Sequence, residues 1–270
     1  MNTKYYVPLL VAAALFARPA SGAFFWDDAD EDAYDDWTFT PVYQNGGEGF
    51  DAWTALTTGY PSTSGGTYLV PYPPHAEPYL GEPERSWGMN GNKAMGRGFE
   101  AALSAGTWTF LAAHHVDLNA VPGFSGFNLK SVYSPANGAF DEGELIRFGF
   151  NHDFSSSGLC VSVSGGKEYD YFEDWDYAPG DTLQYSITWY GNGTYTLSVD
   201  NLDQKWSRLA QGNMGSGQVA MLGAAIYGGS LSESLVFDAY EVIPEPAGAV
   251  PVLALSVFAM ALRRNRQRRS

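Results

Sequence analysis

Large apolar residues alternate with polar ones along much of the chain. Between Thr182 and Trp189 every second residue is a large apolar one, and the same alternation returns between Thr194 and Asn201. Successive side chains of a strand point to opposite faces, so this pattern predicts two half-buried strands. The intervening Gly191-Asn192-Gly193 contains residue types that tolerate positive φ, and it therefore predicts a tight hairpin turn.

Short aromatic or β-branched segments, bounded by Gly, Pro, Asn and Asp, recur from about Trp37 onward. This spacing is typical of an all-β protein built as an antiparallel β-sandwich. The five prolines between Pro71 and Pro83 predict a loop or an edge crossing there. Further strands are expected at Thr107–Ala113, Gly126–Tyr133, Leu145–His152, Gly158–Ser164, Gly217–Ile226 and Ser234–Val242.

Composition agrees with a β-rich domain that has a substantial core. The 270 residues include 8 Trp, 17 Tyr, 16 Phe and 31 Gly, and a domain of this size buries roughly 70–75 % of its unfolded surface. Cys160 is the single cysteine, so an internal disulfide is excluded. Because Leu159 and Val161 flank it, we expect Cys160 to act as a small buried apolar residue.

The N-terminus has the features of a secretory signal. Lys4 precedes a largely apolar segment from Val7 to Phe16, and small residues follow at 19–23. These features predict a signal peptide, with its helix, over residues 1–23, cleaved near Gly22 or Ala23. A buried strand or short core helix is the alternative. Residues 24–36 are mostly acidic and are expected to form a solvated lead-in to the domain.

The C-terminus has three parts in order. Pro244, Glu245 and Pro246 precede the uncharged 16-residue segment Ala247–Leu262. This segment is short for a spanning helix, but basic side chains at its end can extend to the interface and remain in the cytoplasm. A C-terminal core helix is the alternative, although it leaves the basic cluster unexplained. The predicted membrane stop consists of Arg263, Arg264, Arg266, Arg268 and Arg269.

This order of Pro-Glu-Pro, apolar helix and arginine cluster resembles the PEP-CTERM sorting signal, over residues 244–270. The resemblance implies an exported protein whose tail is processed near Pro-Glu-Pro by a membrane transpeptidase of the exosortase type. It also implies a location in the cell envelope, on the cell surface or in the extracellular matrix, with transient or permanent membrane anchoring through the C-terminus. It says nothing about the role of the domain.

Charge is distributed unevenly along the chain. Seven of the 15 basic residues but one of the 30 acidic residues lie in the two end signals, so the middle carries a net charge of about −21. Such a surface repels nucleic acid and anionic lipid, and we therefore expect no nucleic-acid partner. It is compatible with bound cations and with solubility outside the cell.

Three segments of the middle resemble a group of bacterial surface proteins in which a concanavalin-like jelly roll precedes a PEP-CTERM tail. They are Trp87-Gly88-Met89 with Gly98-Phe99 and Leu103, the strand that begins at Gly180-Asp181-Thr182 with the hairpin after it, and the closing strand Phe237–Val242. The resemblance covers most of residues 45–243 and implies one jelly-roll domain at 37–243. Jelly rolls of this kind serve as lectins, glycosidases and scaffolds, so the fold does not assign an activity.

A catalytic candidate lies in the pattern E-x-D-x-x-E at Glu168, Asp170 and Glu173. The pattern resembles the signature of laminarinase-type retaining glycosidases, which implies Glu168 as nucleophile and Glu173 as acid/base. Glu173 reaches the face of the other two only if a β-bulge intervenes. Retention also requires carboxyl groups about 5–5.5 Å apart. The flanking Gly165-Gly166 and Pro179-Gly180 favour a loop instead.

The same stretch offers two other kinds of site. Asp170, Asp174 and Asp176 present hard oxygen ligands that could bind Ca²⁺, the one cofactor the sequence suggests, although a solvated acidic loop is the alternative. Aromatic rings here could stack on the apolar C–H faces of sugars, or they could belong to the core. The stacking candidates are Tyr169, Tyr171 and Trp175.

His114 and His115 are adjacent in a predicted strand and therefore point to opposite faces, so they cannot easily share a metal. We expect one to be buried and hydrogen-bonded and the other to be exposed. The sequence contains no Ser-His-Asp set, P-loop or cysteine metal cluster.

Three functional hypotheses remain open. The first is a non-enzymatic surface protein associated with the exopolysaccharide matrix or the cell envelope. The second is a lectin-like carbohydrate-binding module with a polysaccharide partner. The third is a glycoside hydrolase that uses Glu168 and Glu173.

Overall fold

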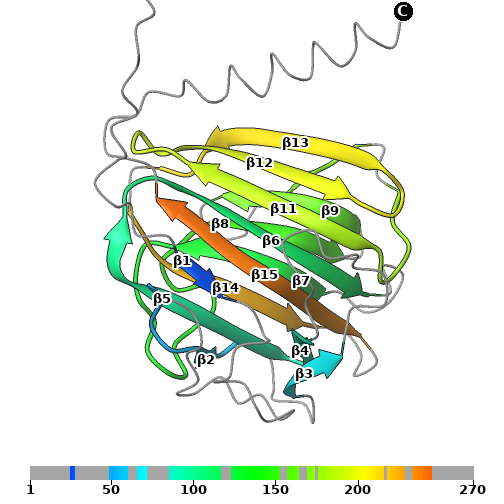
Figure 1. Cartoon of the computed structure of the whole chain (residues 1–270), viewed down its shortest axis with the longest axis horizontal. Coiled ribbons are helices and arrows are strands. Elements are labelled where there is room, and N and C mark those ends of the chain that lie inside the picture. The colour runs from blue at the N-terminus through cyan, green and yellow to red at the C-terminus, as the bar shows by residue number, and fades with distance from the viewer. Residues whose placement is uncertain are drawn as a thin grey trace, which may run out of the picture.

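Antiparallel strands form two stacked sheets in a computed structural model of the chain (Figure 1). It describes residues 25–27, 49–59, 66–71, 85–116, 123–152, 157–163, 169–173, 176–215, 218–228 and 233–244. The predicted signal peptide, most of the acidic lead-in and everything after Pro244 lie outside these residues, including both predicted terminal helices. Within the described ranges, no helix has the length and hydrophobicity needed to cross a bilayer.

Sheet A has eight strands. In spatial order they are β13 (Trp206–Asn213), β12 (Thr194–Asn201), β11 (Thr182–Trp189), β6 (Gly106–His115), β15 (Ser234–Pro244), β4 (Arg85–Asn90) and β3 (Thr67–Pro71), with β1 (Phe25–Asp27) also on β15. One edge of β15 pairs first with β4, through Ser234–Phe237, and then with β1, through Tyr240–Val242. The other edge pairs with β6, and the register shifts there between Asp238 and Glu241.

Sheet B has seven strands. In spatial order they are β10 (Asp170–Tyr171), β9 (Ser157–Val163), β8 (Glu144–His152), β7 (Gly123–Lys130), β14 (Val219–Tyr227), β5 (Lys93–Leu103) and β2 (Thr54–Leu56). The all-β antiparallel sandwich expected from the alternation of residues is therefore confirmed. The hairpin forms at Thr182–Trp189 and Thr194–Asn201, as predicted.

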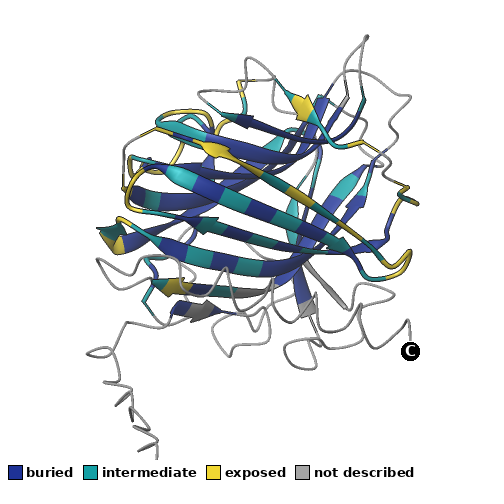
Figure 2. Cartoon of the chain, turned by 90° about the horizontal axis from the view of Figure 1, so that it is seen from above, coloured by how far each residue is buried: buried dark blue, intermediate teal, exposed yellow. Residues whose placement is uncertain are grey.

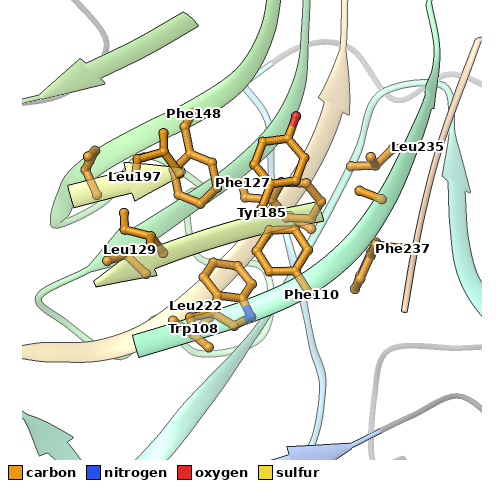
Figure 3. Close-up of a cluster of buried hydrophobic side chains, with 14 of the residues drawn as sticks. Trp108, Phe110, Phe127, Leu129, Phe148, Tyr185, Leu197, Leu222, Leu235 and Phe237 are labelled. Atoms are coloured by element: carbon orange, nitrogen blue, oxygen red, sulfur yellow. The ribbon is translucent and has the colours of Figure 1, made fainter. Parts of the chain in front are cut away.

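The main core lies between the sheets and is rich in aromatic rings (Figure 3). Phe110 lies at its centre, 4.3 Å from Trp108 and 4.3 Å from Phe127 between ring centroids, and stacks on Tyr185 at 5.2 Å. These rings come from three different strands of both sheets, so their burial holds the two layers together. Exposed positions gather in the turns and edge strands, while the central strands are mostly buried (Figure 2).

The outer face of sheet B, which points away from sheet A, is also largely buried. Residues 131–143 form an Ω-loop, closed by the Ser131 amide donating to the Gly143 carbonyl at 2.7 Å. Within this loop, Phe140 packs against Phe124 of β7, with ring centroids 6.3 Å apart. The loop covers a second, smaller apolar cluster of Leu56, Ala94, Phe124, Phe140, Met221, Ala225 and Tyr227.

Two expectations need correction. The predicted strand Gly126–Tyr133 ends at Lys130, because the chain turns there into the Ω-loop. The solvated lead-in does not include Asp27, which is fully buried in β1 and ion-paired with Arg97 of β5. The remaining acidic residues, 28–36, lie outside the described residues.

Candidate functional site

The acidic motif lies at the edge of sheet B. Asp170 pairs with Val161 in the two-residue edge strand β10, and both Asp170 and Glu173 are exposed. Past β10, the Glu173 carbonyl accepts a hydrogen bond from Arg208 Nε at 3.0 Å, so the chain crosses toward sheet A. Glu168 lies outside the described residues. The described part of the motif thus lies at the edge of the sheet, and the Glu168–Glu173 pair that the glycosidase hypothesis requires stays a prediction.

Two of the three calcium candidates lie within the described residues. Asp170 and Asp176 are exposed, and the Asp176 carbonyl accepts a hydrogen bond from the Trp206 indole. Asp174 lies outside the described residues. In the part of the chain that the structure describes, no group of three His, Cys, Asp or Glu side chains could hold a metal ion.

Two of the three predicted stacking residues lie side by side. Tyr171 pairs with Cys160, whose neighbours Leu159 and Val161 face the core, so Tyr171 is on the outer face of sheet B. Tyr169 lies beside it, with ring centroids 6.2 Å apart at an interplanar angle of 42°. Both rings are half-buried. Trp175 lies outside the described residues.

Polar side chains of β8 fix the two tyrosine hydroxyls. Asn151 Nδ2 donates to the Tyr171 hydroxyl at 2.8 Å, and Arg147 NH1 approaches the Tyr169 hydroxyl at 3.5 Å. Arg147, Gly149 and Asn151 alternate with Ile146, Phe148 and Phe150, which are in the core. The outer face of β8 therefore carries the polar side chains of Arg147 and Asn151, with Gly149 between them.

Arg147 is the centre of the polar network on this face. It donates through Nε to Glu144 Oε2 at 2.8 Å and through NH1 to the Tyr227 hydroxyl at 2.6 Å. Its guanidinium lies 5.2 Å from the Phe124 ring centroid and 5.4 Å from that of Phe140. Sequence reasoning missed this network because its members come from β7, β8, β14 and the Ω-loop.

Burial and neighbouring charges shift the pKa values in this network. Burial acts to lower the pKa of Arg147, but Tyr227 and Glu144 outweigh it and raise the pKa, so the guanidinium stays charged. Burial raises the pKa of Glu144, while Arg147 opposes that shift. Burial also raises the pKa of Tyr169, so its hydroxyl stays protonated at neutral pH.

Three buried polar atoms around Arg147 have no hydrogen-bond partner among the described residues. They are Glu144 Oε1, Asn128 Oδ1 and Ser162 Oγ. Asn128 and Ser162 pair with Arg147 in the register of β7, β8 and β9, so one lies on each side of it on the same face. Buried polar atoms are normally satisfied, and orphaned ones mark a place where water or a ligand group can bind.

His114 belongs to the core, as expected for one member of the histidine pair. His114 Nδ1 lies 2.9 Å from Ser125 Oγ, and Nε2 lies 3.0 Å from the Tyr185 hydroxyl. Burial lowers the pKa of His114 to about 3, so the ring is neutral. His115 faces the other side of the strand, and the expectation that it is exposed is wrong, because it is half-buried. Cys160 is fully buried, as predicted.

The solved structures that this chain is similar to share little sequence with it. No family model and no curated protein matches it. Among solved structures, the globular domain of T. cruzi calreticulin is 12 % identical, with a TM-score of 0.47 over 72 % of this chain and 84 % of that one. Lectin II from Ulex europaeus is 11 % identical, with a TM-score of 0.46 over 76 % and 95 %. The Ca²⁺/Man₃GlcNAc-bound VIP36 exoplasmic/lumenal domain is 12 % identical, with a TM-score of 0.42 over 62 % and 82 %.

Proposed function

We propose that this protein is a non-enzymatic carbohydrate-binding module of concanavalin-like type, exported and held at the cell envelope, with its sugar site on the outer face of sheet B. The observation that carries the proposal is the pair Tyr169 and Tyr171, half-exposed side by side with their hydroxyls held by Arg147 and Asn151. Sugar sites combine aromatic surface with a few fixed polar groups, and this face supplies both.

The aromatic pair contributes apolar surface that sugar C–H faces can cover. Because the hydroxyls of Tyr169 and Tyr171 already have partners on β8, the rings are fixed before a ligand arrives. Fixed rings lose little rotamer entropy on binding, so more of the contact energy appears as affinity. Arg147 and Asn151 next to them provide donors for sugar oxygens.

Replacing Tyr171 with alanine tests the sugar site. We expect the variant to lose at least tenfold in affinity, about 1.4 kcal/mol, for the oligosaccharide that wild type binds best on a glycan array. Isothermal titration calorimetry of both proteins gives the ratio. Tyr190→Ala is the matched control, because Tyr190 is equally half-buried but lies at the β11–β12 turn of sheet A. Equal affinity of wild type and Tyr171→Ala would remove this face as the site.

The location is proposed from the two ends of the sequence. We expect a tag placed after Ser270 to be found in the membrane fraction of cells that export the protein, because the arginine cluster stops transfer of the apolar segment. Replacing Arg263, Arg264, Arg266, Arg268 and Arg269 with glutamine should reduce that retention. A full-length tagged product in the soluble periplasmic fraction would refute the anchor and would leave the sugar site unaffected.

A further inference from the structure

The first and the last strand of the domain meet at one end of sheet A (Figure 1). β1 begins at Phe25, which pairs with Val242 of β15, and β15 ends two residues later at Pro244. The two strands are antiparallel neighbours, so the chain enters β1 and leaves β15 at the same end, about 5 Å apart across the ladder. The predicted signal peptide and the predicted C-terminal apolar segment are therefore joined to the domain at adjacent points.

Little chain separates this end from the apolar segment. Pro244 pairs with Gly106, the first residue of β6, so the sheet continues into the first residue of Pro-Glu-Pro. A β-carbon on Gly106 would lie 2.8 Å from the Trp189 indole and 3.2 Å from the Ile243 carbonyl oxygen, so the strand ends pack closely here. Three residue steps lead from Pro244 to Ala247 and span at most about 11 Å. A domain anchored by this segment must therefore lie close to the bilayer.

Three connections of sheet A lie at the same end as these strand termini. They are the β5–β6 turn at 104–105, the β11–β12 turn at 190–193 and residues 214–215 after β13. A β-carbon on Gly191 would lie 3.8 Å from the Ser104 carbonyl oxygen, and the Met214 amide donates to the Gly193 carbonyl at 2.9 Å. The three connections are therefore side by side, and together with Ile243 they are called the exit end.

The exit end is uncharged. None of its three connections contains an acidic or basic residue, although the middle of the chain carries a net charge of about −21. Glu100 of β5 and Glu241 of β15 each lie three residues before the end of their strand, roughly 10 Å back from it. Ile243, next to the exit point, is apolar and 47 % exposed. Such a surface can approach lipid headgroups without charge repulsion from its own turns.

From the paired strand ends, the short link and the uncharged turns we infer that the exit end faces the bilayer and contacts lipid headgroups while the chain is anchored. The inference rests on the proposed anchoring through the C-terminus and adds the surface that meets the lipid. In this orientation the strands stand on the membrane. The outer face of sheet B, with Tyr169 and Tyr171, then points sideways and stays open to a polysaccharide.

Fluorescent labels at the two ends of the sandwich test this orientation. Ser104→Cys places a thiol at the exit end, and Gln204→Cys places one in the β12–β13 turn at the opposite end, both at exposed positions. The eight residues of β12 separate the two ends by roughly 26 Å. Cys160 is fully buried, and burial raises the pKa of its thiol, so it does not react in the folded protein.

Each labelled full-length variant is reconstituted into phosphatidylcholine vesicles that contain a lipid with a nitroxide headgroup. Because a nitroxide quenches only at close range, we expect at least threefold stronger quenching at Ser104→Cys than at Gln204→Cys. The ratio should stay above three when phosphatidylglycerol is added, since the exit end has no acid in its turns. Equal quenching, or stronger quenching at Gln204→Cys, would overturn the inference while the anchoring stands. Failure of both variants to float with the vesicles would refute the anchoring and the inference with it.

Discussion

Replacing Asp27 with alanine is expected to lower the free energy of unfolding by about 3–5 kcal/mol. Asp27 and Arg97 are ion-paired with both side chains fully buried, and the Arg97 guanidinium also lies 4.6 Å from the Phe50 ring centroid. Without its carboxylate partner, Arg97 keeps its charge in a site that excludes water. Urea unfolding of both proteins measures the loss, which should appear in the midpoint with little change in slope.

A double variant separates the cost of an unpaired charge from the contribution of the pair. Asp27→Ala with Arg97→Met should recover much of the lost stability, because a buried ion pair replaced by apolar groups of similar volume is often close to neutral. Glu100→Ala provides an exposed control and should change stability by no more than about 0.5 kcal/mol. If Asp27→Ala unfolds at the wild-type midpoint, the N-terminal strand is not held by this pair.

Acidification should destabilise the domain through His114. Its pKa is about 3 in the folded protein because of burial, against about 6.5 in the unfolded chain. Between these values the unfolded state binds one more proton, so the stabilisation is complete above about pH 6.5 and falls by about 1.4 kcal/mol for each unit toward pH 3. At pH 4.5 the expected loss is about 2.7 kcal/mol from this residue alone.

Unfolding free energies of wild type and His114→Gln, measured between pH 4.5 and 7.5, test this. The variant should show a shallower dependence on pH, by about one proton, whatever its absolute stability. His115→Gln is the matched control, because His115 is adjacent but half-buried, and burial lowers its pKa without removing it from solvent. Parallel pH curves for wild type and His114→Gln would show that His114 is not the group responsible.

The alternation of apolar and polar residues predicted most of the sandwich, because each half-buried strand shows its core face in the sequence. The alternation did not predict the segments whose structure depends on tertiary contacts. Trp206–Asn213 has few β-branched or aromatic residues, and it forms strand β13 because it pairs along its whole length with β12. Aspartate is usually a solvated residue type, so the sequence gives no sign that Asp27 is buried. Its burial depends on Arg97, which is 70 residues away along the chain.

The sequence predicted only part of the candidate site, because the rest depends on tertiary contacts. Tyr169 and Tyr171 stand out as aromatic residues in an acidic stretch, and the structure places them together. Arg147 and Asn151 gave a weaker signal: they are the polar members of a strand whose alternate residues are apolar. Their association with Tyr227 and Glu144 depends on strand register, which the sequence does not reveal.

An NMR titration measures the location of the ligand most directly. With the tightest-binding oligosaccharide, we expect saturable shifts of the Asn151 side-chain amide, which donates to the Tyr171 hydroxyl, and of the Arg147 guanidinium N–H groups, of which NH1 lies 3.5 Å from the Tyr169 hydroxyl. The Asn192 side-chain amide, in the exposed turn of sheet A, should stay unchanged. Saturation of binding with shifts confined to sheet A, and none at Asn151 or Arg147, would show that the sugar does not bind at the tyrosine pair.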